Sequence, residues 1–193
     1  MREEYKQDMV YGIRPVLEAI DSGKEIEKIF IQKGLRSDNF SDLMNQVKEL
    51  QIPYQFVPIE KLNRITRKNH QGIAAYISPI VFDNIEQIVP TIFEKGKSPF
   101  VIILDRITDV RNFGAILRTA EAAGVNAVLI PSKSSAQLNS GTIKSSAGAI
   151  FKVPICRSDN LKETIDFLTN SGFKIVAATE KAESLHYDED LTG

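Results

Sequence analysis

The fold of this chain is constrained most by one stretch of its sequence. In it, a short apolar run leads into a polar loop and then into a helical pattern. Residues 100–104 read Phe-Val-Ile-Ile-Leu, which is typical of a buried parallel strand. A helical pattern over 113–123 follows, and Gly124 stands where a helix end expects glycine. In open α/β sheets, ligands bind at loops that follow the carboxyl ends of strands. We therefore predict that 105–114 is a functional strand-to-helix loop.

The same alternation of strand and helix patterns continues to the end of the chain. The predicted strands are 100–104, 127–131, 152–155 and 173–179, and the predicted helices are 113–123, 141–147 and 161–171. Such alternation favours a parallel sheet with helical crossovers. The chain has no Gly-x-Gly-x-x-Gly and no phosphate-loop motif, which argues against dinucleotide and nucleoside-triphosphate binding.

The first 80 residues predict a smaller α/β unit of their own. Helical patterns cover 12–20, 39–50 and 58–65, and strand patterns cover 26–31, 54–57 and 72–77. Residues 81–99 repeat isoleucine at helical spacing, interrupted by Pro90, so we interpret them as a connecting segment with a first helix. The predicted fold class is therefore α/β, with units at 1–80 and 100–193.

Composition limits the partners that the chain can have. The net charge is −1, which argues against generic polyanion binding, so an RNA partner would need local basic patches. Residues 60–72 carry four basic residues against one acid, and 131–152 carry three lysines and no acid. The alternative is that both stretches are merely solvated faces.

Cysteine content and hydropathy indicate a compartment. The single cysteine, Cys156, excludes an internal disulfide and is predicted to be a small core residue. No apolar run approaches the roughly 20 residues of a membrane span. We therefore expect no membrane partner and a cytoplasmic location.

The motif at 109–120 resembles a known family. Its residues read Asp-x-x-Asn-x-Gly-Ala-x-x-Arg-Thr-Ala, which is similar to the first motif of the SpoU (TrmH-like) RNA 2′-O-ribose methyltransferases. Upstream, 11–19 and 69–75 resemble the N-terminal substrate-binding domain of these enzymes, whose fold some ribosomal proteins share. Residues 134–139 and 144–149 resemble members that methylate a guanosine ribose in 23S ribosomal RNA.

The resemblance implies a SPOUT-type α/β knot, S-adenosylmethionine as cofactor, no metal, an RNA partner that is 23S rRNA, and a homodimer of the complete protein. It assigns catalysis to Arg118 and Asn112. A guanidinium is always protonated, so Arg118 would clamp a phosphate or stabilise a developing alkoxide rather than act as a base. The alternative for Arg118 is a surface salt bridge to Asp105 or Asp109.

Further site residues follow from the resemblance and from the basic patches. The cofactor would be touched by Thr179 and Glu180 at one edge of its pocket. For His70 a purely structural, hydrogen-bonded role is the alternative. The predicted RNA contacts are Arg14, Arg67, Lys68, His70, Gln71, Arg111, Gln137 and Asn139.

The chain also departs from the family pattern. A Gly-x-Glu-x-x-Gly loop and a Ser-Leu-Asn-Val-Ser segment, which the resemblance places in the knot, the cofactor pocket and the dimer interface, do not occur in it. We therefore expect a parallel-sheet unit incomplete at its C-terminus, with no measurable cofactor binding or methyl transfer by these 193 residues alone. A non-catalytic RNA-binding module is the main alternative. An unrelated α/β enzyme is weaker, because the two histidines, His70 and His186, have no metal-ligand spacing.

Overall fold

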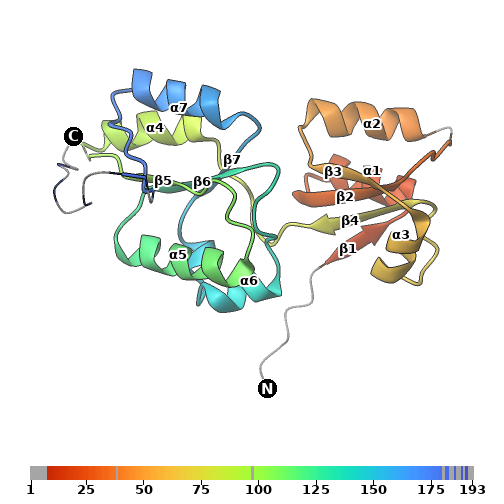
Figure 1. Ribbon diagram of the computed structural model, residues 1–193. Helices are drawn as coiled ribbons and strands as arrows, with labels where there is room; N and C mark the ends of the chain where they lie inside the picture. Colours follow the sequence, from red (N-terminus) through yellow and green to blue (C-terminus); the bar gives the residue numbers. More distant parts are fainter. Residues whose placement is uncertain are drawn as a thin grey trace.

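The computed structural model of the chain contains two α/β units that follow one another in the sequence (Figure 1). It describes residues 8–37, 39–96, 98–179, 181–182, 185, 188 and 190. The first unit consists of β1 (Met9–Tyr11), α1 (Ile13–Asp21), β2 (Ile26–Gln32), α2 (Phe40–Glu49), β3 (Tyr54–Val57), α3 (Ile59–Ile65) and β4 (Ile73–Ile77). The second consists of α4 (Ile85–Glu94), β5 (Val101–Ile103), α5 (Val110–Ala122), β6 (Ala127–Pro131), α6 (Ser140–Ser145), a 3₁₀ turn η1 (Ala149–Phe151), β7 (Ile155–Ser158) and α7 (Leu161–Asn170).

The first sheet has the strand order β1-β4-β2-β3 and is covered on both faces. Strands β2 and β3 are parallel, and β4 is antiparallel to both β1 and β2. Because side chains alternate along a strand, Ile29 and Ile31 of β2 pack with α1 and α2, whereas Phe30 packs with Leu62 of α3. Two apolar clusters therefore lie on opposite faces of one sheet.

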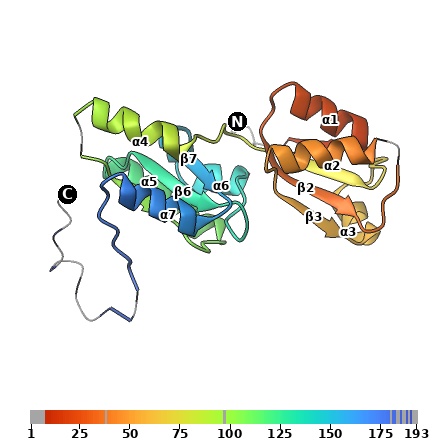
Figure 2. The same ribbon diagram turned by 90° about the horizontal axis from the view of Figure 1, so that it is seen from above.

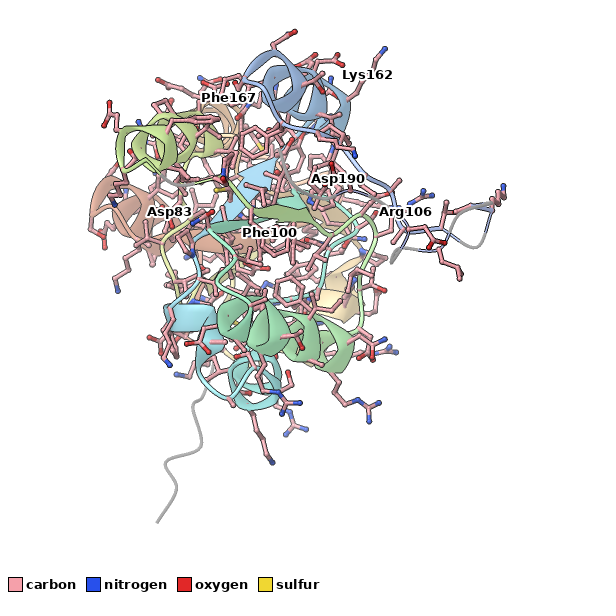
Figure 3. All side chains as sticks on the ribbon, turned by 90° about the vertical axis from the view of Figure 1, so that its left-hand side faces the viewer. Asp83, Phe100, Arg106, Lys162, Phe167 and Asp190 are labelled. Atoms are coloured by element: carbon pink, nitrogen blue, oxygen red, sulfur yellow. The ribbon has the colours of Figure 1, made fainter. Side chains whose placement is uncertain are left out.

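The second sheet is wholly parallel, with the order β5-β6-β7. Val128 and Ile130 of β6 face Phe113 and Leu117 of α5, and the alternate positions of β6 face α4 and α7. Figure 3, which views this unit from its end, shows Phe100 between α7 above and α5 below. The predicted fold class, a small α/β unit followed by a parallel-sheet unit, is confirmed.

Two of the strand predictions are wrong: one strand begins later than predicted, and the other does not form. The strand predicted at 152–155 begins only at Ile155, because the amides of Lys152 and Val153 bond back to the carbonyl of Ala149 in a turn. Residues 173–179 form no strand, and Ile175 and Val176 are exposed. An apolar pattern does not provide a pairing partner, which only the tertiary structure supplies.

One short strand escaped the sequence patterns, and the helix predicted within 81–99 forms without a break at Pro90. Strand β1 has three residues and exists because Met9, Val10 and Tyr11 pair with β4. Helix α4 runs through Pro90, although proline removes one backbone donor there. The helix tolerates this loss because Ile85, Val89 and Ile92 are buried along one side of it.

Cys156 lies in the core, as predicted. Its side chain is fully buried, and its backbone in β7 forms an isolated parallel bridge with Asp83. Burial, with a smaller contribution from the charge of Asp83, raises the pKa of the thiol to about 12. A thiol of that pKa carries almost no thiolate at neutral pH, so Cys156 is unsuited to act as a nucleophile.

In the part of the chain that the structure describes, the helices are all too short or too polar to cross a bilayer.

Candidate RNA-binding and catalytic site

Helix α5 begins at Val110, three residues before the helix predicted from the sequence. The carboxylate of Asp109 caps it by accepting hydrogen bonds from the backbone amides of Arg111 (2.8 Å) and Asn112 (3.0 Å). These bonds lower the pKa of the Asp109 carboxyl. The predicted loop therefore ends at Asp109, and Arg111 and Asn112 stand on the first turn of a rigid helix.

The glycine of the motif lets two helices touch. A Cβ added at Gly114 would lie 1.9 Å from Oγ of Ser145 and 2.8 Å from its carbonyl carbon. Ser145, the last residue of α6, donates a hydrogen bond from its hydroxyl to the carbonyl of Val110 (2.9 Å). Helix α5 is thus held against α6 at a distance that no larger residue allows.

The two arginines of α5 point to solvent. Arg111 and Arg118 are exposed and seven positions apart, so they occupy one side of the helix. Within the described residues, no hydrogen bond or ion pair holds the side chain of Arg118. Asp105 instead pairs with Arg106 at 3.0 Å, so the surface salt bridge considered for Arg118 does not form. Asn112 is also exposed, one position after Arg111.

Asn139, one of the two RNA contacts predicted in the stretch 134–142, has a structural role as a helix cap. The side-chain oxygen of Asn139 caps α6 by accepting from the amides of Gly141 (2.8 Å) and Thr142 (3.3 Å). The hydroxyl of Thr142 donates to the carbonyl of Gln137, whose side chain is exposed. The amide group of Asn139 and the side chain of Gln137 are the parts left for RNA, and contact there stays a prediction.

His70 is buried and bonded through both ring nitrogens. Its Nδ1 accepts from the amide of Gly72 (3.0 Å), which leaves Nε2 as the donor to the side-chain oxygen of Asn63 (2.9 Å). The ring therefore holds the turn that carries Gln71, whose backbone has a positive φ of 48°. The RNA contact predicted for His70 stays a prediction.

The fold brings the two signature stretches of the first unit together. Tyr11 pairs with Ala74 between β1 and β4, and the amide of Gly12 donates to the carbonyl of Ile73 (2.9 Å). Gln71 lies beside Gly12, at the start of α1. The exposed predicted contacts of this unit are Arg14, Arg67, Lys68 and Gln71.

Of the two predicted cofactor residues, Thr179 follows α7 in the chain. Thr179 is exposed, and its hydroxyl accepts from the amide of Lys181 (3.3 Å). Glu180 lies outside the described residues. Among those that are described, no three His, Cys, Asp or Glu side chains gather in a way that could hold a metal ion.

A buried ion pair that the sequence did not reveal joins the two units. Nη2 of Arg157 in β7 lies 2.8 Å from Oε2 of Glu27 in β2, and both side chains are largely buried. The other oxygen of Glu27 accepts from the amide of Leu138, in the stretch just described. The guanidinium of Arg157 stacks 3.6 Å from the ring centre of Phe82, in the connecting segment.

Burial governs the electrostatics of this pair. It raises the pKa of Glu27 and lowers the pKa of Arg157, and in each case the attraction between the two groups opposes the shift only in part. The pair therefore carries a desolvation cost, and its main effect is geometric. Beside it lies a cleft of about 730 Å³ whose lining residues come from both units.

Comparison with known sequences identifies the family. Residues 9–81 match the domain described as RNA 2′-O ribose methyltransferase substrate binding, and 99–192 match the SpoU rRNA methylase family. A Staphylococcus epidermidis protein whose name places it among TrmH-family tRNA/rRNA methyltransferases is 40% identical over 179 residues, which cover 93% of this chain and 72% of the relative. The chain belongs to the SpoU/TrmH family of RNA methyltransferases.

Another relative and two solved structures are also similar to this chain. A protein of the same name from Staphylococcus haemolyticus is 39% identical over 88% of this chain and 68% of its own length. An rRNA methyltransferase structure from Sinorhizobium meliloti has a TM-score of 0.46 at 23% identity, covering 96% of this chain and 67% of that one. The methyltransferase AviRb from Streptomyces viridochromogenes, solved with AdoMet, has a TM-score of 0.41 at 20% identity over 88% and 62%. The family assignment rests on the sequence matches.

Replacing Gly114 with alanine should destabilise this SpoU-family unit. The added Cβ would meet backbone as well as side-chain atoms of Ser145, so α5 and α6 must separate. We expect a loss of about 1–3 kcal/mol, or more, in the free energy of unfolding, measured by chemical denaturation. Arg118→Ala, an exposed position on the same helix, should change it by less than about 0.5 kcal/mol. Equal stability of Gly114→Ala and the wild type would contradict the close contact.

Removing Glu27 should loosen the two units from each other. Glu27→Ala leaves the buried Arg157 unpaired, a change that typically costs about 3–5 kcal/mol. We expect faster limited proteolysis in the connection at 78–84, with Glu18→Ala on the exposed side of α1 as the control.

The double variant Glu27→Leu/Arg157→Met tests the cause of this loosening. It removes both charges and should recover much of the resistance to proteolysis. Unchanged cleavage in Glu27→Ala would show that the ion pair does not hold the units together.

Proposed function

We propose that this protein transfers a methyl group from S-adenosylmethionine to the 2′-hydroxyl of a ribose in RNA. The proposal rests on one observation: Arg118 and Arg111 are exposed on one side of α5, and this helix is packed closely against α6. Family membership supports the methyl transfer, and the substrate-binding domain matched by 9–81 supports the ribose 2′-oxygen as its target.

The chain's own residues can supply positioning and charge stabilisation. A ribose hydroxyl is a weak nucleophile, and its oxygen gains negative charge as it attacks. The guanidinium of Arg118 can donate hydrogen bonds to that oxygen or grip an adjacent phosphate through two donors. Since Arg118 is itself protonated, the hydroxyl proton leaves to water rather than to this side chain.

S-adenosylmethionine, when bound, supplies a methyl group on a positively charged sulfur. Asn112, on the first turn of α5, would hold the substrate beside Arg118. Thr179 and Glu180 would contact the methyl donor at one edge of its pocket.

For the substrate we propose a guanosine of 23S ribosomal RNA, on the likeness of residues 134–139 to enzymes that modify it. A homodimer of the complete protein and a cytoplasmic location belong to the same proposal. The relatives' names include both tRNA and rRNA, so the choice between these RNAs is part of what an assay must decide.

The decisive experiment follows a labelled methyl group from S-adenosylmethionine into RNA, using the longest form of the protein that its gene encodes. The labelled RNA is then hydrolysed in alkali. Alkaline cleavage needs a free 2′-hydroxyl, so a 2′-O-methyl group leaves the label in an uncut dinucleotide. A label in mononucleotides would mean methylation of a base and would contradict the proposal. No transfer at all would favour the non-catalytic RNA-binding module.

Arg118→Ala should abolish this transfer while leaving the fold intact. The side chain is exposed, and no hydrogen bond or ion pair holds it within the described residues, so its removal should affect the reaction rather than the fold. Lys162→Ala is the control, because it removes one exposed positive charge from α7, in the layer opposite α5 (Figure 3). A near wild-type rate in Arg118→Ala would remove Arg118 from the mechanism.

The expectation that the 193 residues alone bind no S-adenosylmethionine stays a prediction. Calorimetric titration of this chain with S-adenosylmethionine tests it, and we expect no heat of binding. Micromolar affinity would contradict it and would place a sufficient pocket within 1–193. In that case Thr179→Val should weaken the binding if the predicted edge of the pocket is correct.

A further inference from the structure

One face of the first sheet carries three lysines arranged around aromatic rings. On the side that α3 partly covers, Lys28 of β2 stands directly across from Tyr76 of β4. Phe30 and Tyr76 pack edge to face, with ring centres 5.9 Å apart. We define the lysine–aromatic face by its members Tyr11, Lys28, Phe30, Lys61, Lys68 and Tyr76.

The rings hold the ammonium groups in place. Nζ of Lys61 lies 5.1 Å and Nζ of Lys28 lies 5.4 Å from the centre of the Phe30 ring. Nζ of Lys68 lies 5.4 Å from the centre of the Tyr11 ring. Cations are attracted to the faces of aromatic rings, so these contacts restrict the conformations of the three lysine side chains.

The positive charge of this face is not balanced by carboxylates. Within the described residues, no ion pair joins Lys28, Lys61 or Lys68 to an acid. Glu27, the acid next to Lys28 in the chain, is already bonded to Arg157. Burial lowers the pKa of Lys28, repulsion from the nearby charge of Lys61 adds to this shift, and attraction to Glu27 opposes it. A bound anion would relieve that repulsion.

The face lies on the same side of the molecule as the catalytic helix. In Figure 1, α3 of the first unit, and α5 and α6 of the second, lie below their respective sheets. Figure 2, seen from above, places α3 and α5 away from the viewer, in agreement with this arrangement. One strand of RNA can therefore pass from the lysine–aromatic face toward Arg111 and Arg118 without crossing either sheet.

We propose that the lysine–aromatic face binds the phosphate backbone of the RNA substrate, with Lys28 and Lys61 as its central contacts. This inference rests on the proposed function and specifies which surface of the first unit holds the RNA. Ammonium groups gathered around aromatic rings suit phosphates, and phosphate contacts position an RNA, whereas contacts to base edges specify its sequence.

The test measures binding of a fluorescein-labelled single-stranded oligouridine to the 193-residue chain, by fluorescence anisotropy over a series of salt concentrations. The variant Lys28→Gln/Lys61→Gln removes two phosphate contacts. We expect the slope of log K against log salt to become shallower by about 1.4, since each contact on a single strand contributes about 0.7.

The matched control is Lys24→Gln/Lys48→Gln. It removes the same charge from the turn after α1 and from α2, on the opposite side of the sheet. This variant should keep the slope of the wild type. Thermal unfolding of all variants verifies that the fold is retained.

Two outcomes would overturn the proposal, and they are distinguishable. If the wild type binds and both double variants change equally or not at all, the lysine–aromatic face is not the contact, whereas the proposed function stands. If the wild type does not bind the oligouridine at low salt, the face is not a phosphate-binding surface, and the methyl-transfer assay decides the proposed function separately. A loss of slope confined to Lys28→Gln/Lys61→Gln supports the proposal.

Discussion

The buried pair of Glu27 and Arg157 relates the two units of this protein to each other. Its carboxylate also accepts from the amide of Leu138, so one side chain of the first unit touches a stretch that resembles part of the family's site. Burial works against both charges, and nonpolar side chains of similar size can often replace such a pair without loss of stability. The pair therefore serves to fix the orientation of the two units, because an ion pair forms in one arrangement, whereas two apolar surfaces can pack in several.

The motif of α5 divides into residues that build the helix and residues that the helix presents. Asp109 caps the first turn, and Gly114 lets Ser145 approach, so these two are needed for the frame. Arg111 and Arg118 are exposed on one side of that frame. A helix fixed at its start and against its neighbour loses little entropy when a substrate binds, which is what a site that positions two reactants requires.

The lysines of the lysine–aromatic face are likewise held in place before the proposed RNA binds. The chain as a whole is slightly negative, so long-range attraction cannot account for affinity. Three lysines held near aromatic rings concentrate positive charge on one surface instead. In the proposed function, their location on the side of α5 would place a bound RNA backbone near Arg111 and Arg118.

Much of this could be read from the sequence because the information was local. Apolar runs and helical spacing located β3 and β6 to the residue. The roles that the motif at 109–120 predicts for Arg118 and Asn112 stay predictions. Composition placed the single cysteine in the core. Each of these features depends on residues that are close neighbours in the chain.

The tertiary structure decided what depends on distant partners. Residues 173–179 look like a strand but have nothing in the described chain to pair with, whereas Met9–Tyr11 form one because β4 lies beside them. The bonds of His70 and the pairing of Glu27 with Arg157, 130 positions apart, leave no periodic signal. Propensity and spacing describe a segment by itself, but strand pairing and buried charge neutralisation are set by which segments the fold brings into contact.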